Sequence, residues 1–396
     1  MIEAVARQRV RAAGRRTDSR LLAFLRRLDW VLMAATLALV GYGLWLVSGI
    51  TRFDVPGDQN YHVVRQAIAG VLGFTGLVAA AIVPIDRARR HWRLLYGATL
   101  GLMILVFLAA ETIRGSKRWI DLGVIQFQPS ELGKVLFVLA IAGFLVERQG
   151  RVNRWRTVVK AIGLGTVPIL LVFLQPDLGT ALVYGAALVA VLFFVGVRWR
   201  QLLAVLLAVG FVGLSVLWLL PTAGVEVLKP YQADRVTGFL DPDRDRGGLT
   251  WNLNQSLTAV GAGGLSGRGV VEASQTRLDY LPEHATDFAF ASLAEQRGFV
   301  GSAILLLLYL LVVWRGLRVI TVAGDLYGAV VAGGLVFALL FQVFVNVGMT
   351  MGLAPITGIP LPFVTVGGSS LVTNLLLVGV LQGIHARGLL GNRPTP

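Results

Sequence analysis

The sequence predicts an all-α integral membrane protein with about ten transmembrane helices. Of its 396 residues, 55% are hydrophobic and only 15% are charged, and the mean hydropathy is +0.71. Such a composition lies far outside the range of soluble globular domains. Apolar runs of about 20 residues, the length needed to cross a bilayer, also recur along the chain. We therefore interpret the chain as one multi-pass membrane domain.

The predicted spans define a domain with a short segment at each end. A basic arm occupies residues 1–28, the membrane domain residues 29–388, and a short tail residues 389–396. The fifth span is short and ends at Gln175-Pro176-Asp177. The apolar runs cover residues 29–50, 63–85, 94–112, 131–147, 161–175, 178–197, 202–220, 289–314, 326–352 and 369–386.

The net charge of +14 is concentrated in the arm and between the apolar runs. An excess of Lys and Arg marks the cytoplasmic side of a membrane protein. Both termini are therefore predicted to be cytoplasmic and the opposite connections extracytoplasmic, with the arm touching anionic lipid rather than nucleic acid. The arm and the connections at 86–93, 148–160, 198–201, 315–325 and 387–396 hold 23 of the 36 lysines and arginines.

One outer connection, residues 221–288 between the seventh and eighth spans, is too long to be a hairpin. Connections of this length usually carry function. Within it, the stretch LTWNLNQSLTAVG (249–261) places Leu253, Leu257 and Val260 on one helical face. This pattern predicts a helix lying at the membrane interface.

Two stretches on the outer side are predicted to interrupt regular structure, TAVGAGGLSGRG (258–269) and ITGIPLPFVTVGGSS (356–370). Neither has the spacing of a phosphate-binding P-loop. Irregular backbone at membrane depth must be buried in protein or line a cavity. The second stretch is therefore predicted to re-enter the bilayer before the last span.

Polar groups at the outer ends of the spans are candidates for a functional site, because charges at membrane depth are costly. In RGSKRWID (114–121), Arg114, Lys117 and Arg118 concentrate positive charge where a phosphate or pyrophosphate could bind. The alternative is that these side chains only reach lipid headgroups. Trp119 beside them is typical of an interfacial anchor.

Three further acidic or basic residues lie near helix starts on the same side. Glu131 and Lys134 are three residues apart and share a helical face, which favours an ion pair that either joins helices or shapes a polar cavity. Asp177 follows a proline between two spans. It suits a helix cap, and lining a cavity is compatible with capping.

The stretch LPEHATDFAF (281–290) holds Glu283, His284 and Asp287 directly before a span, and Glu295 follows two turns later. Thr286 or Asp287 could cap the helix. A cap does not need the other ionisable groups, so the cluster favours chemistry.

The absence of cysteine excludes disulfides, thiolate metal sites and a cysteine nucleophile. Only four histidines are present, which leaves little room for a histidine-built metal centre. No ligand cluster in the sequence demands a metal, and Mg²⁺ is kept only as an alternative aid to a leaving pyrophosphate.

Four stretches together resemble the SEDS family of shape, elongation, division and sporulation proteins. They are GSKRWIDLGVIQFQPSELGK, QPDLGTA, the run from RVTGFLDP through GAGGLSGRG to LPEHATDFAF, and NVGMTMGLAPITGIPLPFVTVGGSS. They occur in the family's order and span nearly the whole chain after the arm. The GIPLPF wording is more similar to the elongation branch of the family than to its division branch.

The resemblance implies a protein of the bacterial cell membrane that polymerises lipid II into glycan strands. A class B penicillin-binding protein, a transpeptidase, would cross-link the growing strand. The implied roles fall on Asp287 as the essential aspartate, on Trp119, and on Glu131 and Lys134. The family commonly has histidine where this chain has Ala285, so the neighbouring His284 receives no catalytic role.

The implied reaction is an inverting displacement at the donor's anomeric carbon, for which one general base suffices. Asp287 is the candidate base, Glu283 a candidate positioning group, and the cations of residues 114–118 are candidates for the leaving pyrophosphate. Two other hypotheses are a lipid II transporter, which would carry polar groups through to the cytoplasmic side, and a non-catalytic scaffold for the penicillin-binding protein.

Overall fold

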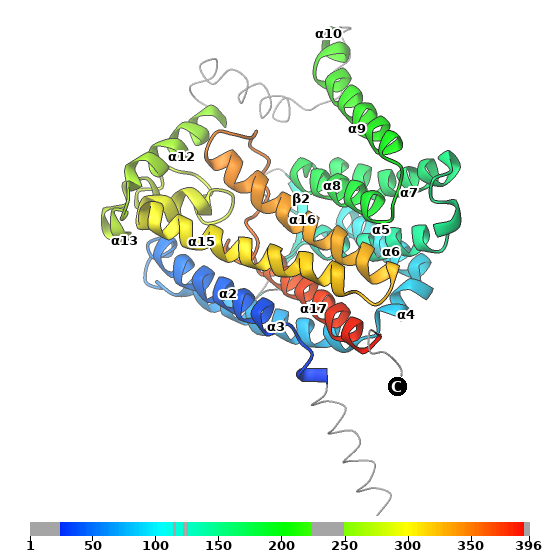
Figure 1. The fold of residues 1–396 in the computed structure, drawn as a ribbon. Helices are drawn as coiled ribbons and strands as arrows, with labels where there is room; N and C mark the ends of the chain where they lie inside the picture. The colour runs from blue at the N-terminus through cyan, green and yellow to red at the C-terminus, as the bar shows by residue number, and fades with distance from the viewer. Residues whose placement is uncertain (1–23, 114–115, 122, 124–125, 223–248, 392–396) are drawn as a thin grey trace, which may run out of the picture.

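The computed structural model describes residues 24–113, 116–121, 123, 126–222 and 249–391 (Figure 1). In these residues, eight helices are long and apolar enough to cross a membrane, and the shorter apolar helices α8 (Leu178–Phe194) and α9 (Trp199–Leu214) fill the sixth and seventh predicted positions. The all-α membrane fold is therefore confirmed. The eight are α2 (Trp30–Ile50), α3 (Tyr61–Ile82), α5 (Trp92–Ala109), α6 (Pro129–Val146), α7 (Trp155–Leu174), α15 (Ala289–Val322), α16 (Leu326–Thr350) and α17 (Gly368–Gly391).

Two helices are longer than their apolar runs. The fifth span was predicted as 161–175, but α7 begins at Trp155 and has 20 residues. The eighth was predicted to end at 314, but α15 continues to Val322. In both cases the extra turns carry basic residues, which lower the local hydropathy without breaking the helix. Hydropathy alone therefore predicts these two helices to be shorter than they are.

Three helices form the centre of the molecule and the others surround them. α6 and α17 have 83% of their most apolar window buried and α16 has 72%, whereas α3 and α5 have 22%. α17 lies along α3 and also contacts α6, α15 and α16. Because the three inner helices are mostly covered by protein, their buried polar residues must find partners within the fold.

Small residues allow the inner helices to approach closely. A Cβ atom built on Gly379 of α17 would lie 2.2 Å from the carbonyl oxygen of Leu77 in α3. One built on Gly73 of α3 would lie 2.6 Å from a methyl carbon of Leu375. Any larger residue would force the two helices apart, which explains why this pair needs glycine on both sides.

A small antiparallel sheet connects α5 to α6 and was not predicted from the sequence. Its strands are β1 (Glu111–Ile113), β2 (Ser116–Asp121) and β3 (Gln126–Phe127), with β2 in the middle. Trp119 pairs with Glu111, and Ile120 pairs with Phe127. The sheet gives the basic stretch a defined backbone at the outer end of the bundle.

The described part of the long connection, from residue 249 onward, contains three helices, α12 (Leu249–Gly263), α13 (Gly269–Glu272) and α14 (Ser274–Arg277). α12 matches the predicted helix and packs on α15. Leu253 is buried and Val260 packs beside it, but Leu257 is 42% exposed. Ser256 takes the buried position instead, and its hydroxyl donates to the carbonyl of Thr350 at 2.8 Å.

The glycine-rich stretch after α12 lies directly on the backbone of α15. α15 is interrupted at Gly298, which has φ 64° and ψ −160°. The amide of Phe299 donates to the carbonyl of Gly264 at 2.8 Å, and that of Val300 to Leu265 at 3.1 Å. The break in α15 therefore gives its free amides to the glycine loop, and the prediction of irregular structure here holds after residue 263.

The segment between α16 and α17, residues 351–367, is non-helical and largely buried. The residues that are 2% exposed or less are Thr357, Ile359, Leu361, Phe363, Val364 and Thr365. We call residues 351–367 the central segment. Its irregular backbone survives in an apolar setting because other helices supply hydrogen bonds to it.

The remaining elements lie on the side predicted to be cytoplasmic or at the end of α9. They are α4 (Ile85–Arg90), η1 (Gln149–Arg151), the π-helical turn η2 (Ser215–Leu219) and α10 (Leu220–Thr222). α9 stands apart from the bundle in Figure 1, and its exposed face is rich in leucine, valine and phenylalanine. That surface suits contact with lipid tails.

A buried ion pair joins three helices at the end of the bundle where the chain enters. Asp29 caps α2 and is 2% exposed. Arg315 of α15 donates to it through Nε at 2.9 Å and Nη2 at 2.6 Å. Gln382 of α17 makes two bonds with the Asp29 backbone, both at 2.8 Å. This cluster fixes the mutual positions of α2, α15 and α17.

We expect Asp29→Ala to lower the free energy of unfolding by about 3–5 kcal/mol, because it leaves Arg315 buried and unpaired. The matched control is Glu147→Ala, which removes an exposed ion pair with Arg148 and should cost no more than about 1 kcal/mol. The measurement is chemical unfolding in detergent. Equal losses in the two variants would contradict the assigned role of the cluster.

Candidate functional site

Asp177 organises a polar cluster at the N-terminal ends of α6 and α8. Its Oδ1 accepts from the amide of Thr180 at 3.1 Å, so it caps α8 as predicted. Its Oδ2 accepts from Nε2 of Gln128 at 2.9 Å, and Nη1 of Arg118 lies 3.8 Å from Oδ1. The carboxylate is therefore both a helix cap and the acidic partner of a cation on β2.

The same cluster reaches α17 through Gln128. The amide of Gln128 donates to the Ser369 hydroxyl at 3.0 Å, and that hydroxyl lies 3.3 Å from the Gln128 carbonyl. Arg118 also donates to the carbonyl of Pro176. Its side chain is 17% exposed and its buried Nε has no partner in the described part of the chain.

Glu131 and Lys134 form the ion pair that their spacing predicts. The Lys134 ammonium lies 2.9 Å from each carboxylate oxygen of Glu131, and both residues are almost completely buried in α6. Tyr184 of α8 packs on the same turn and donates to the carbonyl of Ser130 at 2.9 Å. The ion pair lies within α6, and the Tyr184 hydroxyl is the link from this turn to α8.

The other residues of the basic stretch are described only in part. Arg114 lies outside the described residues, and for Lys117 the backbone alone is described, paired with Thr112 in the sheet. Trp119 is half-buried on β2 beside Arg118. The sheet therefore places this segment next to Asp177, but no contact of these three side chains is established.

Asp287 lies in a tight turn before α15. The N-cap of α15 is Phe288, which has no side-chain cap, so Asp287 is one residue outside the helix. The turn is closed by Glu283, whose carbonyl accepts from the amides of Thr286 and Phe288, each at 3.1 Å. The Glu283 carboxylate also accepts from the Thr286 hydroxyl at 2.8 Å. These bonds hold Asp287, which is half-buried, in a fixed loop.

Backbone strain accompanies this turn. Glu283 has φ 56°, a left-handed conformation that non-glycine residues rarely adopt. Such strain persists only where surrounding bonds over-determine the backbone, and it is concentrated at functional sites. The bonds to Thr286 and Phe288 supply that constraint.

Asn346 connects the Asp287 turn to the central segment. Its Nδ2 donates to the carbonyl of Asp287 at 2.9 Å and to that of Ile359 at 2.7 Å. Asn346 is completely buried in α16. A second link joins the amide of Val366 to the carbonyl of Ala285 at 2.9 Å. The turn that carries Asp287 is therefore fixed to the central segment at two points.

The central segment also touches the Asp177 cluster. A Cβ atom built on Gly179, two residues after Asp177, would lie 2.6 Å from Ile359 and 2.7 Å from the carbonyl oxygen of Thr357. Ile359 thus packs on α8 with its side chain and on Asn346 with its carbonyl. The fold therefore places the Asp177 cluster on one side of the central segment and the Asp287 turn on the other.

The Glu295 side chain does not stand free in a cavity. It anchors the long connection before α15 through hydrogen bonds. Its carboxylate accepts from the amides of Gln275 and Thr276, at 2.8 and 2.9 Å, and from the Thr276 hydroxyl at 2.7 Å. Its carbonyl accepts from the amide of Arg268 at 2.9 Å. Glu295 is completely buried and secures α14 and the glycine loop to α15.

His284 joins two loops through two aspartates. Its Nε2 lies 3.2 Å from Asp54 in the connection between α2 and α3, and its Nδ1 lies 3.3 Å from Asp279. His62 of α3 also lies 3.9 Å from Asp54. Burial lowers the pKa of His284, but the hydrogen bond and charge of Asp54 and the charge of Asp279 outweigh it, so its pKa is raised.

Metal binding finds no support in the described residues. No group of three or more His, Asp or Glu side chains there is arranged to hold a metal ion. The group most similar to such an arrangement is His284 with Asp54 and Asp279, and these side chains connect two loops.

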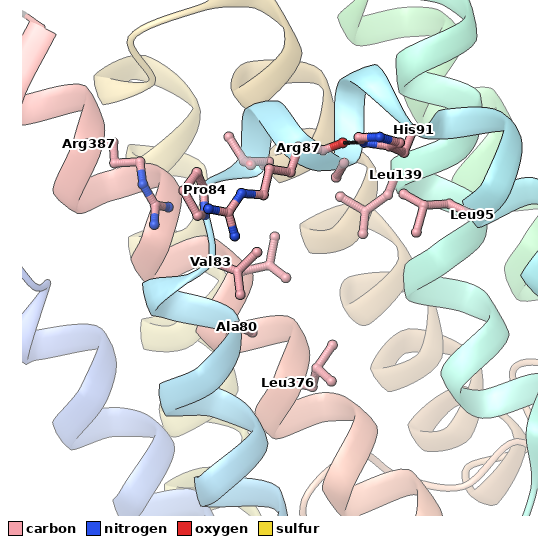
Figure 2. Close-up of a pocket in the computed structure, with 12 residues that line it drawn as sticks. Ala80, Val83, Pro84, Arg87, His91, Leu95, Leu139, Leu376 and Arg387 are labelled. Atoms are coloured by element: carbon pink, nitrogen blue, oxygen red, sulfur yellow. Dashed lines mark hydrogen bonds between the residues drawn. The ribbon is translucent and has the colours of Figure 1, made fainter.

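A pocket of about 380 Å³ lies at the opposite end of the bundle (Figure 2). It is open on one side and lined by the C-terminal end of α3, by α4, and by parts of α5, α6 and α17. Asp287 lies before α15, at the other end of the spans. This pocket is thus separate from the candidate site.

Several residues of the site escaped prediction. Asn346 and Gln66 lie within long apolar runs, and Asp54 lies in an ordinary loop. A buried amide inside a transmembrane helix is the signal that could have found Asn346 and Gln66, because such groups need partners at membrane depth. No local pattern marks Asp54, which acts on a residue 230 positions away.

Known proteins resemble this chain over most of its length. Residues 26–388 match the FtsW/RodA/SpoVE family, described as cell cycle proteins. The chain is 36% identical over 359 residues to the peptidoglycan glycosyltransferase MrdB of Escherichia coli strain K12, covering 90% of this chain and 94% of that protein. It is 37% identical over 399 residues to the probable peptidoglycan glycosyltransferase FtsW of Thioalkalivibrio sulfidiphilus, covering 97% and 95%.

A solved structure has the same fold. It is a chain of the structure "Structural coordination of polymerization and crosslinking by a peptidoglycan synthase complex". The TM-score is 0.76 at 32% sequence identity, and the match covers 90% of this chain and 97% of that one.

We expect the contribution of His284 to stability to depend on pH. Since its pKa is raised in the folded state, this contribution is fully present below the unfolded pKa of about 6.5 and is lost as pH rises through the folded pKa. His284→Gln should therefore lower Tm more at about pH 6 than at about pH 9. Thermal unfolding in detergent measures the difference.

The control for this experiment is His91→Gln, since His91 is exposed and bonded only to the carbonyl of Arg87. Its effect on Tm should be small at both pH values. A loss for His284→Gln that stays the same across the range would show that the imidazole acts through packing alone.

Proposed function

Because the chain belongs to the FtsW/RodA/SpoVE family of cell cycle proteins, we propose that it is a peptidoglycan glycosyltransferase that polymerises lipid II into glycan strands. The family is the one that the sequence motifs predicted. The observation that carries the proposal is the match to curated peptidoglycan glycosyltransferases over about nine-tenths of the chain. Two of the motifs that carry the resemblance, QPDLGTA and LPEHATDFAF, also contact the central segment, at Gly179 and at Ala285.

Asp287 is the general base in the proposed reaction. It takes the proton from the 4-hydroxyl of the acceptor sugar as that oxygen bonds to the anomeric carbon of the donor. The bond from this carbon to the pyrophosphate oxygen breaks, and the pyrophosphate leaves with its electron pair. One in-line step of this kind inverts the anomeric configuration. Glu283, Asn346 and the central segment hold the base in position.

The cationic stretch supports departure of the pyrophosphate. Arg118 has a buried donor that finds no partner among the described residues, and it lies beside the helix cap at Asp177. Together with Arg114 and Lys117, it is proposed to neutralise the charge that develops on the leaving group. Trp119 is the proposed neighbour of the lipid-linked substrate, and the buried Glu131–Lys134 pair keeps α6 in place behind it.

We assign the chain to cell-wall elongation and rod shape rather than to division. Relatives named MrdB and FtsW match at nearly equal identity, so the assignment rests on the GIPLPF wording at residues 358–363. A division role is the alternative. Depletion of the protein in its host distinguishes the two, because loss of elongation gives round cells and loss of division gives filaments.

The protein is a multi-pass membrane protein, and its proposed orientation follows its charges. The termini are assigned to the cytoplasm and Asp287 to the outer face of the bacterial cell membrane. The proposed partner is a class B penicillin-binding protein that cross-links the strand. Support comes from the structural neighbour, which belongs to a complex that coordinates polymerization and crosslinking.

We expect Asp287→Asn to lower glycan polymerisation by purified protein on labelled lipid II by about 10²–10⁴-fold, the usual contribution of a positioned base. The matched control is Asp58→Asn, which alters an exposed loop carboxylate on the same side and should retain activity. Strand length on gels, with and without the transpeptidase, is the measurement. Each variant is first checked for unchanged Tm.

Three outcomes would overturn the proposal. A folded Asp287→Asn protein that polymerises at the wild-type rate would show that Asp287 is not the general base. Wild-type protein that moves lipid II across vesicles and makes no glycan would favour a transporter, and protein that does neither but raises transpeptidase activity would favour a scaffold.

A further inference from the structure

The pocket at the end of the bundle opposite Asp287 has an apolar interior. Its volume of about 380 Å³ falls within the range of pockets that bind small ligands, about 300–1,000 Å³. It opens beside side chains that face the membrane, since Ile82, Val83 and Leu94 are 55%, 49% and 70% exposed. The interior is lined by Ala80, Val83, Leu95, Leu139, Leu376 and Val380. Such a space suits a hydrocarbon chain that enters from the bilayer.

Two guanidinium groups stand at the mouth of this pocket. Figure 2 shows them pointing into the space beside Pro84, Arg387 from α17 and Arg87 from α4. Arg387 donates to the carbonyls of Ala81 at 3.0 Å and Ile82 at 2.6 Å, at the end of α3. It is therefore held in place before any ligand binds.

The positive charge at the mouth is only partly balanced by the protein, through the charge of Asp86, which acts on Arg387 from beyond ion-pair distance. Neither Arg87 nor Arg387 has a carboxylate partner among the described residues. The nearest acid in sequence, Asp86, lies 3.9 Å from Arg89, and Arg89 also lies 3.8 Å from Asp325. Residues 84–93 hold four arginines and one aspartate, so this surface carries a net positive charge.

We propose that this pocket binds an anionic glycerophospholipid, with one acyl chain in the apolar interior and the phosphate diester between Arg87 and Arg387. An anionic headgroup fits because two cations face it at a membrane surface, where each contributes to binding. A zwitterionic headgroup would place its own ammonium among the arginines. The site is separate from Asp287 and does not depend on the proposed glycosyltransferase activity.

The test compares binding of phosphatidylglycerol and phosphatidylcholine to purified full-length protein, measured by native mass spectrometry from a mixed detergent solution. We expect phosphatidylglycerol to bind more tightly. Arg87→Gln should weaken it about fivefold, the share of one arginine near a membrane surface. The side chain of Arg87 makes no other bond in the described residues, so this change should leave the fold intact.

Two further variants separate the pocket from general surface charge. Arg90→Gln removes an exposed arginine of the same helix that does not line the pocket, and it should leave phosphatidylglycerol binding within about twofold of wild type. Ala80→Phe fills the interior and should weaken both lipids while all arginines remain. The Tm of each variant confirms folding.

Three results would overturn the proposal. Equal binding of the two lipids would show that the pocket has no preference for an anionic headgroup. An equal loss in Arg90→Gln and Arg87→Gln would assign the effect to surface charge. Unchanged binding in a folded Ala80→Phe protein would show that the lipid lies outside the pocket.

Discussion

The constraint on which this structure depends is that every buried backbone polar group needs a partner when water is absent. Helices satisfy it internally, but most residues from 356 to 365 in the central segment are buried without being helical. Their carbonyls must therefore accept bonds from side chains that lie at membrane depth. Asn346 bonds to Ile359, Gln66 to Thr365, and Tyr309 to Pro362. Those donors come from three different helices, so satisfying one irregular segment also sets how the helices are arranged.

The same bonds bring the functional groups together. Asn346 shares its amide between Ile359 and Asp287, and the amide of Val366 holds the loop at Ala285. On the other side, the side chain of Ile359 packs against Gly179 beside the Asp177 cluster. A substitution in the central segment would therefore affect both the position of Asp287 and the cluster of Asp177 with Arg118. This arrangement preorganises a site whose parts lie more than 100 residues apart in the chain.

Positioning accounts for more of the polar residues than direct chemistry does. Glu295 binds amides of α14, His284 joins two loops through aspartates, and Glu131 pairs with Lys134. Each is an ionisable group that sequence reasoning could assign to a cavity. Buried charges survive where they are paired or hydrogen-bonded, and these three are. Asp287 differs because it stands in a strained turn outside the helix cap.

The sequence by itself determined the membrane class, the order of the spans, the outer polar clusters and the family, because hydropathy, charge and motif spacing are local properties. It also predicted the cap at Asp177 and the Glu131–Lys134 pair, whose partners lie within three residues. Only the tertiary structure decided the sheet beside α6, the docking of the glycine loop on Gly298, and the contact of His284 with Asp54. These features depend on contacts between segments that are far apart in the sequence. No local sequence pattern specifies which buried groups will be in contact.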